Sequence, residues 1–229
     1  MLEKIKTINL LDLDKTIAYH LLLKYKYAYE TLAEIKGYTI YMGNYLSLKN
    51  YDLVKENVWI SKTANVYDTA TIEGPVIIGD ETEVRPGAWI RGNAIIGKNC
   101  VIGNSTEIKN SILFDNVQVP HFNYVGDSIL GYKAHFEAGT ITSNQKSDKS
   151  NITIKIDDNV IFTNLRKFGA IVGDYVEIGC NAVLNPGTII GRNTTIYPLT
   201  SVEGFIEEDS ILKLSQEQDL VKKLKLIKK

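Results

Sequence analysis

The sequence predicts a mainly β protein in which short strands stack into one long solenoid. Aliphatic residues recur at every sixth position between residues 60 and 108, and again between residues 172 and 202. A small or modest residue precedes each by two positions, so both side chains point to the same side of a strand. Turn-forming sequences such as Gly79-Asp80 and Pro86-Gly87 separate the units. Each unit is therefore one flat face of a prism, and its apolar side must pack on neighbouring units.

The spacing is too regular for a chance run of aliphatic residues in an ordinary sheet. The first series comprises Ile60, Val66, Ile72, Ile78, Val84, Ile90, Ile96, Ile102 and Ile108, and Phe114 continues it. The second series comprises Val172, Ile178, Leu184, Ile190, Ile196 and Val202. These series place the solenoid at about residues 57–205.

The segments outside the repeat are expected to form appendages. Residues 12–36 carry an apolar helical stripe with Asp12 or Asp14 as the cap and Gly37 after the end, which predicts one helix. A solenoid needs its open end covered, so residues 1–56 are interpreted as a helical cap. Residues 143–169 interrupt the repeat as an arm, with a hairpin expected over 151–164. Residues 206–229 are expected to form a tail with a short C-terminal helix over 211–229.

Composition excludes several classes of protein. The formal net charge of −1 gives no field that would attract nucleic acid. No stretch reaches the roughly 20 apolar residues that span a bilayer, and the first residues do not resemble a signal peptide. Two cysteines, Cys100 and Cys180, form no disulfide framework. A cytoplasmic, reducing location is therefore expected.

Three histidines are the first candidates for chemistry. His20 falls in the expected helix, where packing is the simpler role, whereas His121 and His135 lie after the first series ends. A neutral imidazole can take a proton from an attacking amine. A metal site of the three-histidine type would need one histidine more than these two, so no metal is predicted.

The repeat length also predicts neighbours along the solenoid. Arg91 and Lys109 are 18 residues apart, so three six-residue units per coil would stack them at about one strand spacing, roughly 4.8 Å. Two cations that close repel unless an anion bridges them; the alternative is two solvated surface charges. The same count puts Arg85, Gly103 and His121 in another column.

Two motifs carry a resemblance to a known family. Residues 120–128 read Pro-His-Phe-Asn-Tyr-Val-Gly-Asp-Ser, and residues 138–144 read Ala-Gly-Thr-Ile-Thr-Ser-Asn. They resemble the acetyltransferase domain of bifunctional N-acetylglucosamine-1-phosphate uridyltransferases and the archaeal sugar-1-phosphate acetyltransferases, which are hexapeptide-repeat acyltransferases. The resemblance implies a left-handed parallel β-helix, acetyl-CoA as the cosubstrate without a metal, and a homotrimer.

The resemblance also assigns roles to residues of this chain. It makes His121 the general base and implies substrate contacts by Lys109, Tyr124 and Asn144. The substrate arginine is Arg85 by motif or Arg91 by spacing, and both remain open. Two departures concern the acceptor: His135 stands where bacterial members have asparagine, and an expected lysine falls on Ser150, with Lys149 beside it. Acetyl-CoA contacts fall on Ala138, Cys180 and Pro198.

The expected function is transfer of an acetyl group from acetyl-CoA to the amine of a hexosamine 1-phosphate such as glucosamine 1-phosphate. One alternative is an acyltransferase with another sugar or nucleotide-sugar acceptor. Another is a non-catalytic scaffold or regulatory protein with the same fold.

Overall fold

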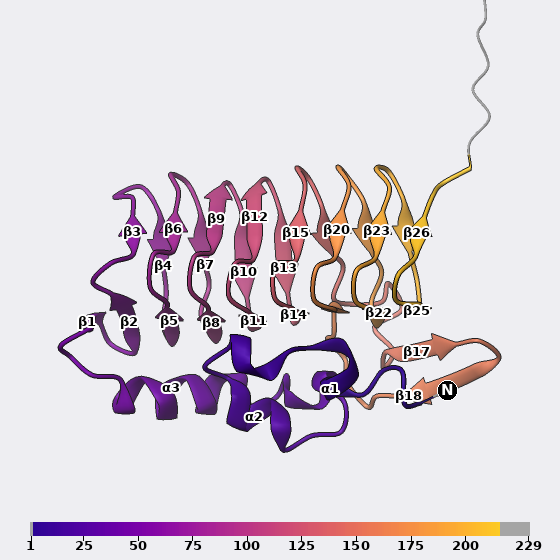
Figure 1. The fold of residues 1–229 in the computed structure, drawn as a ribbon, viewed down its shortest axis with the longest axis horizontal. Helices are drawn as coiled ribbons and strands as arrows, with labels where there is room; N and C mark the ends of the chain where they lie inside the picture. Colours follow the sequence, from indigo (N-terminus) through magenta and orange to yellow (C-terminus); the bar gives the residue numbers. More distant parts are fainter. Residues whose placement is uncertain (1, 216–229) are drawn as a thin grey trace, which may run out of the picture.

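A computed structural model describes residues 2–215 as a parallel β-helix whose coils stack in a single row (Figure 1). Each complete coil gives one strand to each of three sheets, here called sheets A, B and C. Val58 lies opposite Val76, and Val76 lies opposite Ala94, so the first coils are 18 residues long. The solenoid that the six-residue period predicts is confirmed.

The strands follow one another around the prism in the order A, B, C. Sheet A contains β1 (Tyr51–Lys55), β2 (Val58–Ser61), β5 (Val76–Ile78), β8 (Ala94–Ile96), β11 (Ser111–Leu113), β14 (Ile129–Leu130), β19 (Ala170–Val172), β22 (Thr188–Ile190) and β25 (Phe205–Ile206). Sheet B contains β3 (Asn65–Val66), β6 (Glu83–Val84), β9 (Val101–Asn104), β12 (Gln118–His121), β15 (His135–Phe136), β20 (Glu177–Ile178), β23 (Thr195–Ile196) and β26 (Ile211–Leu212). Sheet C contains β4 (Thr71–Ile72), β7 (Trp89–Ile90), β10 (Glu107–Lys109), β13 (Tyr124–Gly126), β16 (Ile141–Thr142), β21 (Val183–Leu184) and β24 (Ser201–Val202).

Two coils in the middle of the stack are one residue shorter than the others. Ile95 lies opposite Ile112, and Ile112 lies opposite Ile129. The residue is lost at the corner from sheet C to sheet A, so Leu113, not Phe114, lies opposite Ile96. The repeat then continues through β16 and does not break down after Phe114, as the uninterrupted six-residue count had suggested.

The arm leaves the stack after β16 and returns at β19. It contains the antiparallel hairpin of β17 (Thr153–Ile156) and β18 (Asn159–Phe162), which confirms the hairpin expected over 151–164. The last coil reaches beyond residue 205, because β25 pairs with β22 and β26 pairs with β23. Residues 211 and 212 are therefore strand, not the start of a helix; the rest of the predicted C-terminal helix, from 216 on, lies outside the described residues.

The N-terminal segment does not form the single helix expected over residues 12–36. It contains α1 (Thr7–Leu10), η1 (Leu13–Lys15), α2 (Tyr19–Leu23), η2 (Ala28–Thr31) and α3 (Ile35–Tyr45). Its backbone is interrupted because it bonds to corners of the β-helix. Leu10 O accepts from Asp174 N, Lys15 O accepts from Asp115 N, and Asp12 N donates to Asp174 Oδ2 at 2.7 Å.

This segment lies along the side of the solenoid rather than across its open end (Figure 1). The reason is a column of outward-facing aliphatic residues on sheet A, in which each residue is at most 1% exposed: Ile77, Ile95, Ile112, Ile129, Ile171 and Ile189. Such a column must be buried by other parts of the chain. The N-terminal helices and the base of the arm provide that cover, so sheets B and C carry the free outer faces.

Candidate functional site

The B–C corner, where each coil passes from sheet B to sheet C, brings His121 into one column with three other predicted site residues. His121 lies opposite Asn104, and the same register leads to Ala138, Cys180 and Pro198. A ladder of backbone hydrogen bonds links these coils: Gly139 N donates to His121 O, Asn181 N to Ala138 O, and Leu199 N to Cys180 O, at 2.9–3.0 Å. The predicted base and the predicted acetyl-CoA contacts therefore lie along one edge.

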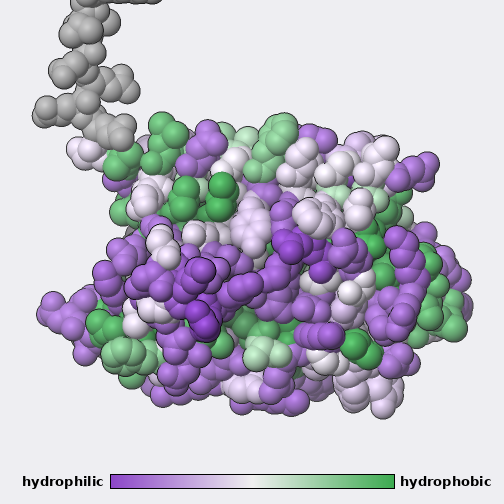
Figure 2. Space-filling model, turned by 180° about the vertical axis from the view of Figure 1, so that it is seen from behind, coloured by the Kyte–Doolittle hydropathy of each residue, from purple (hydrophilic) through white to green (hydrophobic). Residues whose placement is uncertain are grey.

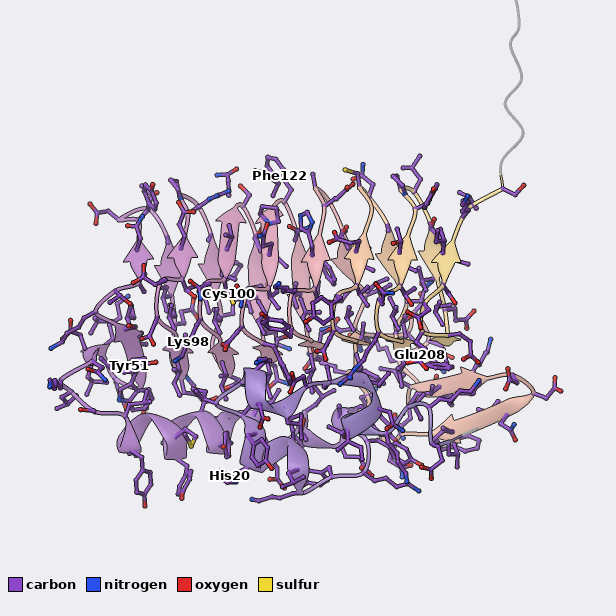
Figure 3. All side chains as sticks on the ribbon, viewed as in Figure 1. His20, Tyr51, Lys98, Cys100, Phe122 and Glu208 are labelled. Carbon is purple, nitrogen blue, oxygen red and sulfur yellow. The ribbon has the colours of Figure 1, made fainter. Side chains whose placement is uncertain are left out.

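The His121 side chain is exposed at this edge, and the backbone beside it is held by a buried amide. Asn123 Oδ1 accepts from His121 N at 3.1 Å, and Asn123 Nδ2 donates to Glu137 O at 2.8 Å. Phe122, next to His121, is 62% exposed and has a φ of 52°. Figure 3 shows Phe122 at the edge of the solenoid that lies away from the N-terminal helices.

Gly103 does not lie beneath His121, although the 18-residue count placed it there. The coil is one residue shorter, so Gly103 lies opposite Pro120 and His121 lies opposite Asn104. A Cβ atom at Gly103 would be 1.5 Å from Pro120 O. Gly103 therefore makes room for the backbone beside His121 and not for a ligand.

Glu137 binds Cys180 at the same corner. Its Oε2 atom accepts from Cys180 N at 2.9 Å and from Cys180 Sγ at 3.0 Å. The hydrogen bond that the Cys180 thiol donates to Glu137 raises the pKa of the thiol, and the two bonds that Glu137 accepts from Cys180 lower the pKa of Glu137. A raised pKa disfavours the thiolate, which is the form in which a cysteine acts as a nucleophile.

A second cluster lies at the C–A corner, on the other side of sheet C. Asp127, only 5% exposed, is its centre: Oδ2 accepts from Lys109 Nζ at 3.1 Å and from Asn144 Nδ2 at 2.6 Å. Asn144 Nδ2 also donates to Tyr124 Oη at 3.0 Å. Burial, followed by the charge of Asp127, raises the pKa of Tyr124. Three predicted substrate residues are therefore connected: Lys109 and Asn144 through Asp127, and Tyr124 through Asn144.

Arg91 stands beside Lys109, as the 18-residue spacing predicts for this coil. Trp89 lies opposite Glu107 in register, Arg91 Nη1 is 2.6 Å from Glu107 Oε1, and its guanidinium lies 4.9 Å from the Trp89 ring centroid. An anion is not needed to hold the two cations together, because Glu107 pairs with Arg91 and Asp127 pairs with Lys109. The expectation that a bound anion must bridge Arg91 and Lys109 was therefore wrong.

Arg85 lies at the B–C corner, across sheet C from Lys109, and pairs with Glu83 at 3.0 Å. Figure 2, the view from behind, shows mostly hydrophilic residues across the middle of the molecule and hydrophobic patches along its upper edge.

Two predicted site residues are not brought to either cluster. His135 projects from sheet B, where its Nδ1 atom is 2.9 Å from Glu177 Oε2. Lys149 lies in the arm before β17, is exposed, and accepts a hydrogen bond from Arg166 Nη2 through its carbonyl. Neither has a contact with Tyr124, Lys109 or Asn144 within the described chain.

Sequence reasoning missed four residues that hold the site together: Asn110, Glu107, Asp127 and Glu137. Asp127 had a signal, since it ends the Tyr-x-Gly-Asp motif that was quoted only for its tyrosine. The other three have none in a single sequence, because their partners are set by which coil lies next to which.

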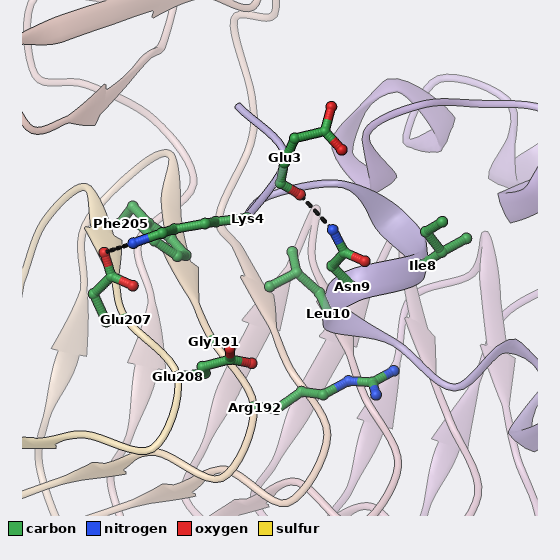
Figure 4. A pocket seen from close by; sticks show the side chains of 10 residues that line it. All are labelled: Glu3, Lys4, Ile8, Asn9, Leu10, Gly191, Arg192, Phe205, Glu207 and Glu208. Atoms are coloured by element: carbon green, nitrogen blue, oxygen red, sulfur yellow. Dashed lines mark hydrogen bonds and ion pairs between the residues drawn. The ribbon is translucent and has the colours of Figure 1, made fainter. Parts of the chain in front are cut away.

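A cavity of about 300 Å³ that does not include these residues lies where the N-terminal segment meets the last coils (Figure 4), and the Lys4–Glu207 ion pair crosses it. Over residues 2–215, no three histidine, cysteine or acidic side chains gather as a metal site would require. In the same part of the chain, no helix is long and apolar enough to cross a membrane.

Two family profiles and several curated proteins match the sequence of this chain. The family profile described as the GMPPB C-terminal domain matches residues 72–166, and the profile described as bacterial transferase hexapeptide (six repeats) matches residues 169–204. The bifunctional protein GlmU of Methanococcus vannielii is 36% identical over 78% of this chain and 48% of its own length. The bifunctional sugar-1-phosphate nucleotidylyltransferase/acetyltransferase of Sulfurisphaera tokodaii is 32% identical over 86% of this chain and 54% of its own.

The chain thus spans about half the length of the curated relatives that it matches. Among solved structures, a putative acetyltransferase from Bacillus cereus covers 66% of this chain and 77% of its own length, with 21% identity and a TM-score of 0.37.

Proposed function

We propose that this chain is a hexapeptide-repeat acyltransferase and that it transfers the acetyl group of acetyl-CoA to the amine of a hexosamine 1-phosphate such as glucosamine 1-phosphate. The observation that carries the proposal is the position of His121. It shares one corner column with Ala138, Cys180 and Pro198, and sheet C connects that corner to the cluster of Tyr124, Asn144 and Lys109.

In this mechanism His121 is the general base. The substrate amine attacks the thioester carbonyl carbon while the imidazole takes the proton that the amine loses. The new C–N bond forms, the C–S bond breaks, and the sulfur of CoA leaves and takes up a proton. Cys180 takes no part as a nucleophile, because its thiol is bound to Glu137. The donor lies along the edge that contains Ala138, Cys180 and Pro198.

The sugar phosphate lies across sheet C, with its phosphate at the C–A corner. Arg91 is the arginine that fits this position, since it stands beside Lys109 in register while Arg85 occupies the opposite corner. The forked guanidinium suits bidentate contact with a phosphate, and the phosphate must compete with Glu107 for it. His135 and Lys149 stay outside this arrangement unless a neighbouring subunit brings its own surface to them, as the trimer of this family implies.

A second candidate keeps the fold and changes the acceptor. The two cations at the C–A corner already have carboxylate partners, which weakens the preference for a terminal phosphate. This observation favours testing an amino sugar carried on a nucleotide beside the free sugar phosphates.

The experiment measures thiol release from acetyl-CoA with glucosamine 1-phosphate, galactosamine 1-phosphate, a nucleotide-linked amino sugar and no acceptor in parallel. Release that requires an amino sugar phosphate supports the proposal, whereas release only with the nucleotide-linked sugar supports the second candidate. His121→Ala should lower kcat by roughly 100-fold or more, as for loss of a general base, with acetyl-CoA binding retained in calorimetry. His20→Ala, in α2, is the matched control and should remain active; an active His121→Ala would remove His121 from the mechanism.

A further inference from the structure

We propose that Asp127 is a positioning residue that fixes the orientation of the Asn144 amide, so that Asn144 offers an acceptor and Tyr124 offers a donor to the bound acceptor sugar. The inference rests on the proposed function for its substrate, but the orientation itself can be measured without turnover.

The carboxylate of Asp127 is surrounded by donors alone. Lys109 Nζ and Asn144 Nδ2 donate to Oδ2, and Asn110 Nδ2 donates to Oδ1 at 2.8 Å. Its backbone is also held, because Asp127 N donates to Lys109 O and Asp127 O accepts from Gly169 N. A carboxylate paired with an ammonium group has no hydrogen to donate. Any group that faces Asp127 must therefore present a hydrogen.

This condition decides which end of the Asn144 side chain faces inward. The NH₂ group must face Asp127, and its two hydrogens are then used by Asp127 Oδ2 and Tyr124 Oη. Within residues 2–215, no protein donor reaches Asn144 Oδ1. That oxygen is left as an acceptor for an N–H or O–H group of a ligand.

The same chain of bonds orients Tyr124. Its hydroxyl oxygen accepts from Asn144, so its own hydrogen remains available, and no described protein group takes it. The site therefore presents one acceptor, one donor and the Lys109 ammonium side by side. An amino sugar phosphate has the matching groups: an amine or hydroxyl to donate, a ring or hydroxyl oxygen to accept, and a phosphate anion. A sugar without a donor at the Asn144 position would leave Oδ1 unpaired.

The N-terminal segment takes part in this network. Asn110 Nδ2 donates one hydrogen to Asp127 Oδ1 and the other to Leu32 O at 3.2 Å. Asn93, Asn110 and Asp127 occupy the same corner in three successive coils, with φ values of 52°, 47° and 48°. The side chain of Asn93 has no hydrogen-bond partner in the described chain, so Asn93 is a matched control for Asn110.

The first test compares Asn110→Gly with Asn93→Gly. Glycine adopts positive φ readily, so both variants should fold. Asn110→Gly loses one hydrogen bond to Asp127 and should lower kcat/KM for the amino sugar phosphate by roughly 10-fold, with the KM for acetyl-CoA unchanged. Asn93→Gly should match the parent protein. Equal activity of all three proteins would overturn the inference.

Asp127→Gly tests the orientation directly. Glycine keeps the positive φ of this corner but removes the carboxylate that requires the NH₂ group to face inward, so the Asn144 amide is free to turn its oxygen toward the Tyr124 hydroxyl. We expect kcat/KM for the amino sugar phosphate to fall by roughly 30- to 100-fold, again with acetyl-CoA little affected.

A spectroscopic measurement separates this inference from the proposed function. The Asn144 side-chain amide signals are assigned in a ¹H–¹⁵N spectrum by their loss in Asn144→Ala. A short bond to a carboxylate should give one hydrogen that is shifted downfield and exchanges slowly, and this signal should be lost in Asp127→Gly and kept in Asn93→Gly. If the signal is unchanged in Asp127→Gly, the inference is refuted. If the parent protein turns over no amino sugar phosphate, the proposed function fails while this signal still decides the role of Asp127.

Discussion

Burial of the outer face of sheet A can be tested with one pair of substitutions. Ile77 and Ile141 both point outward from their strands, but Ile77 is fully buried while Ile141, on sheet C, is 39% exposed. Ile77 packs with Tyr51 and Trp59, and with Ile17, Met42 and Leu46 at the edge of that cluster. Ile77→Ala therefore removes buried methyl groups from the contact between the N-terminal segment and the β-helix.

The expected cost follows from this burial. Truncation of a fully buried isoleucine costs about 2–5 kcal/mol, and about 3 kcal/mol corresponds to a fall of about 6–12 °C in Tm for a chain of this size. Ile141→Ala should lower Tm by less than about 3 °C, because its side chain is already partly in water. Thermal unfolding followed by circular dichroism measures both. Similar small shifts for the two variants would show that sheet A is not covered as described.

Two further predictions concern the B–C corner. Gly103→Ala should lower the free energy of unfolding by about 3 kcal/mol or more, since its Cβ would lie 1.5 Å from Pro120 O. The control is Gly37→Ala, which has no atom within 4 Å of its Cβ and should be neutral or stabilising. Thermal unfolding compares the two variants, and an unchanged Tm in Gly103→Ala would contradict the 17-residue register. Glu137→Gln should remove the carboxylate that raises the pKa of Cys180, so the thiolate forms at lower pH and iodoacetamide modifies Cys180 faster at pH 8 than in the parent protein. Cys100 should stay unmodified in both proteins until they unfold, because burial raises the pKa of its thiol to about 12; an unchanged rate at Cys180 would show that Glu137 does not control it.

The candidate site was partly predictable because its residues lie at repeat positions. Arg91 and Lys109 belong to coils of 18 residues, so counting placed them together. The same counting failed for Gly103 and His121, because the next coil is 17 residues long. Lys109, Tyr124 and Asn144 could be named from the resemblance, but the hydrogen-bond network that joins them through Asp127 and Asn144 could not, since it links three successive coils.

The sequence by itself determined the solenoid and the hairpin arm, because both follow from patterns local to a few residues. A strand alternates its side chains, a corner needs turn-forming residues, and the six-residue period repeats these two requirements. Only the tertiary structure decided the length of each coil, the face that the N-terminal segment covers, and the orientation of the Asn144 amide. Coil length depends on the number of residues at each corner between sheets C and A, where Asn110 alone takes the place of Gly92 and Asn93. The cover of sheet A and the bond from Asn110 to Leu32 join residues that are distant in the chain, and such contacts have no period for a sequence to display.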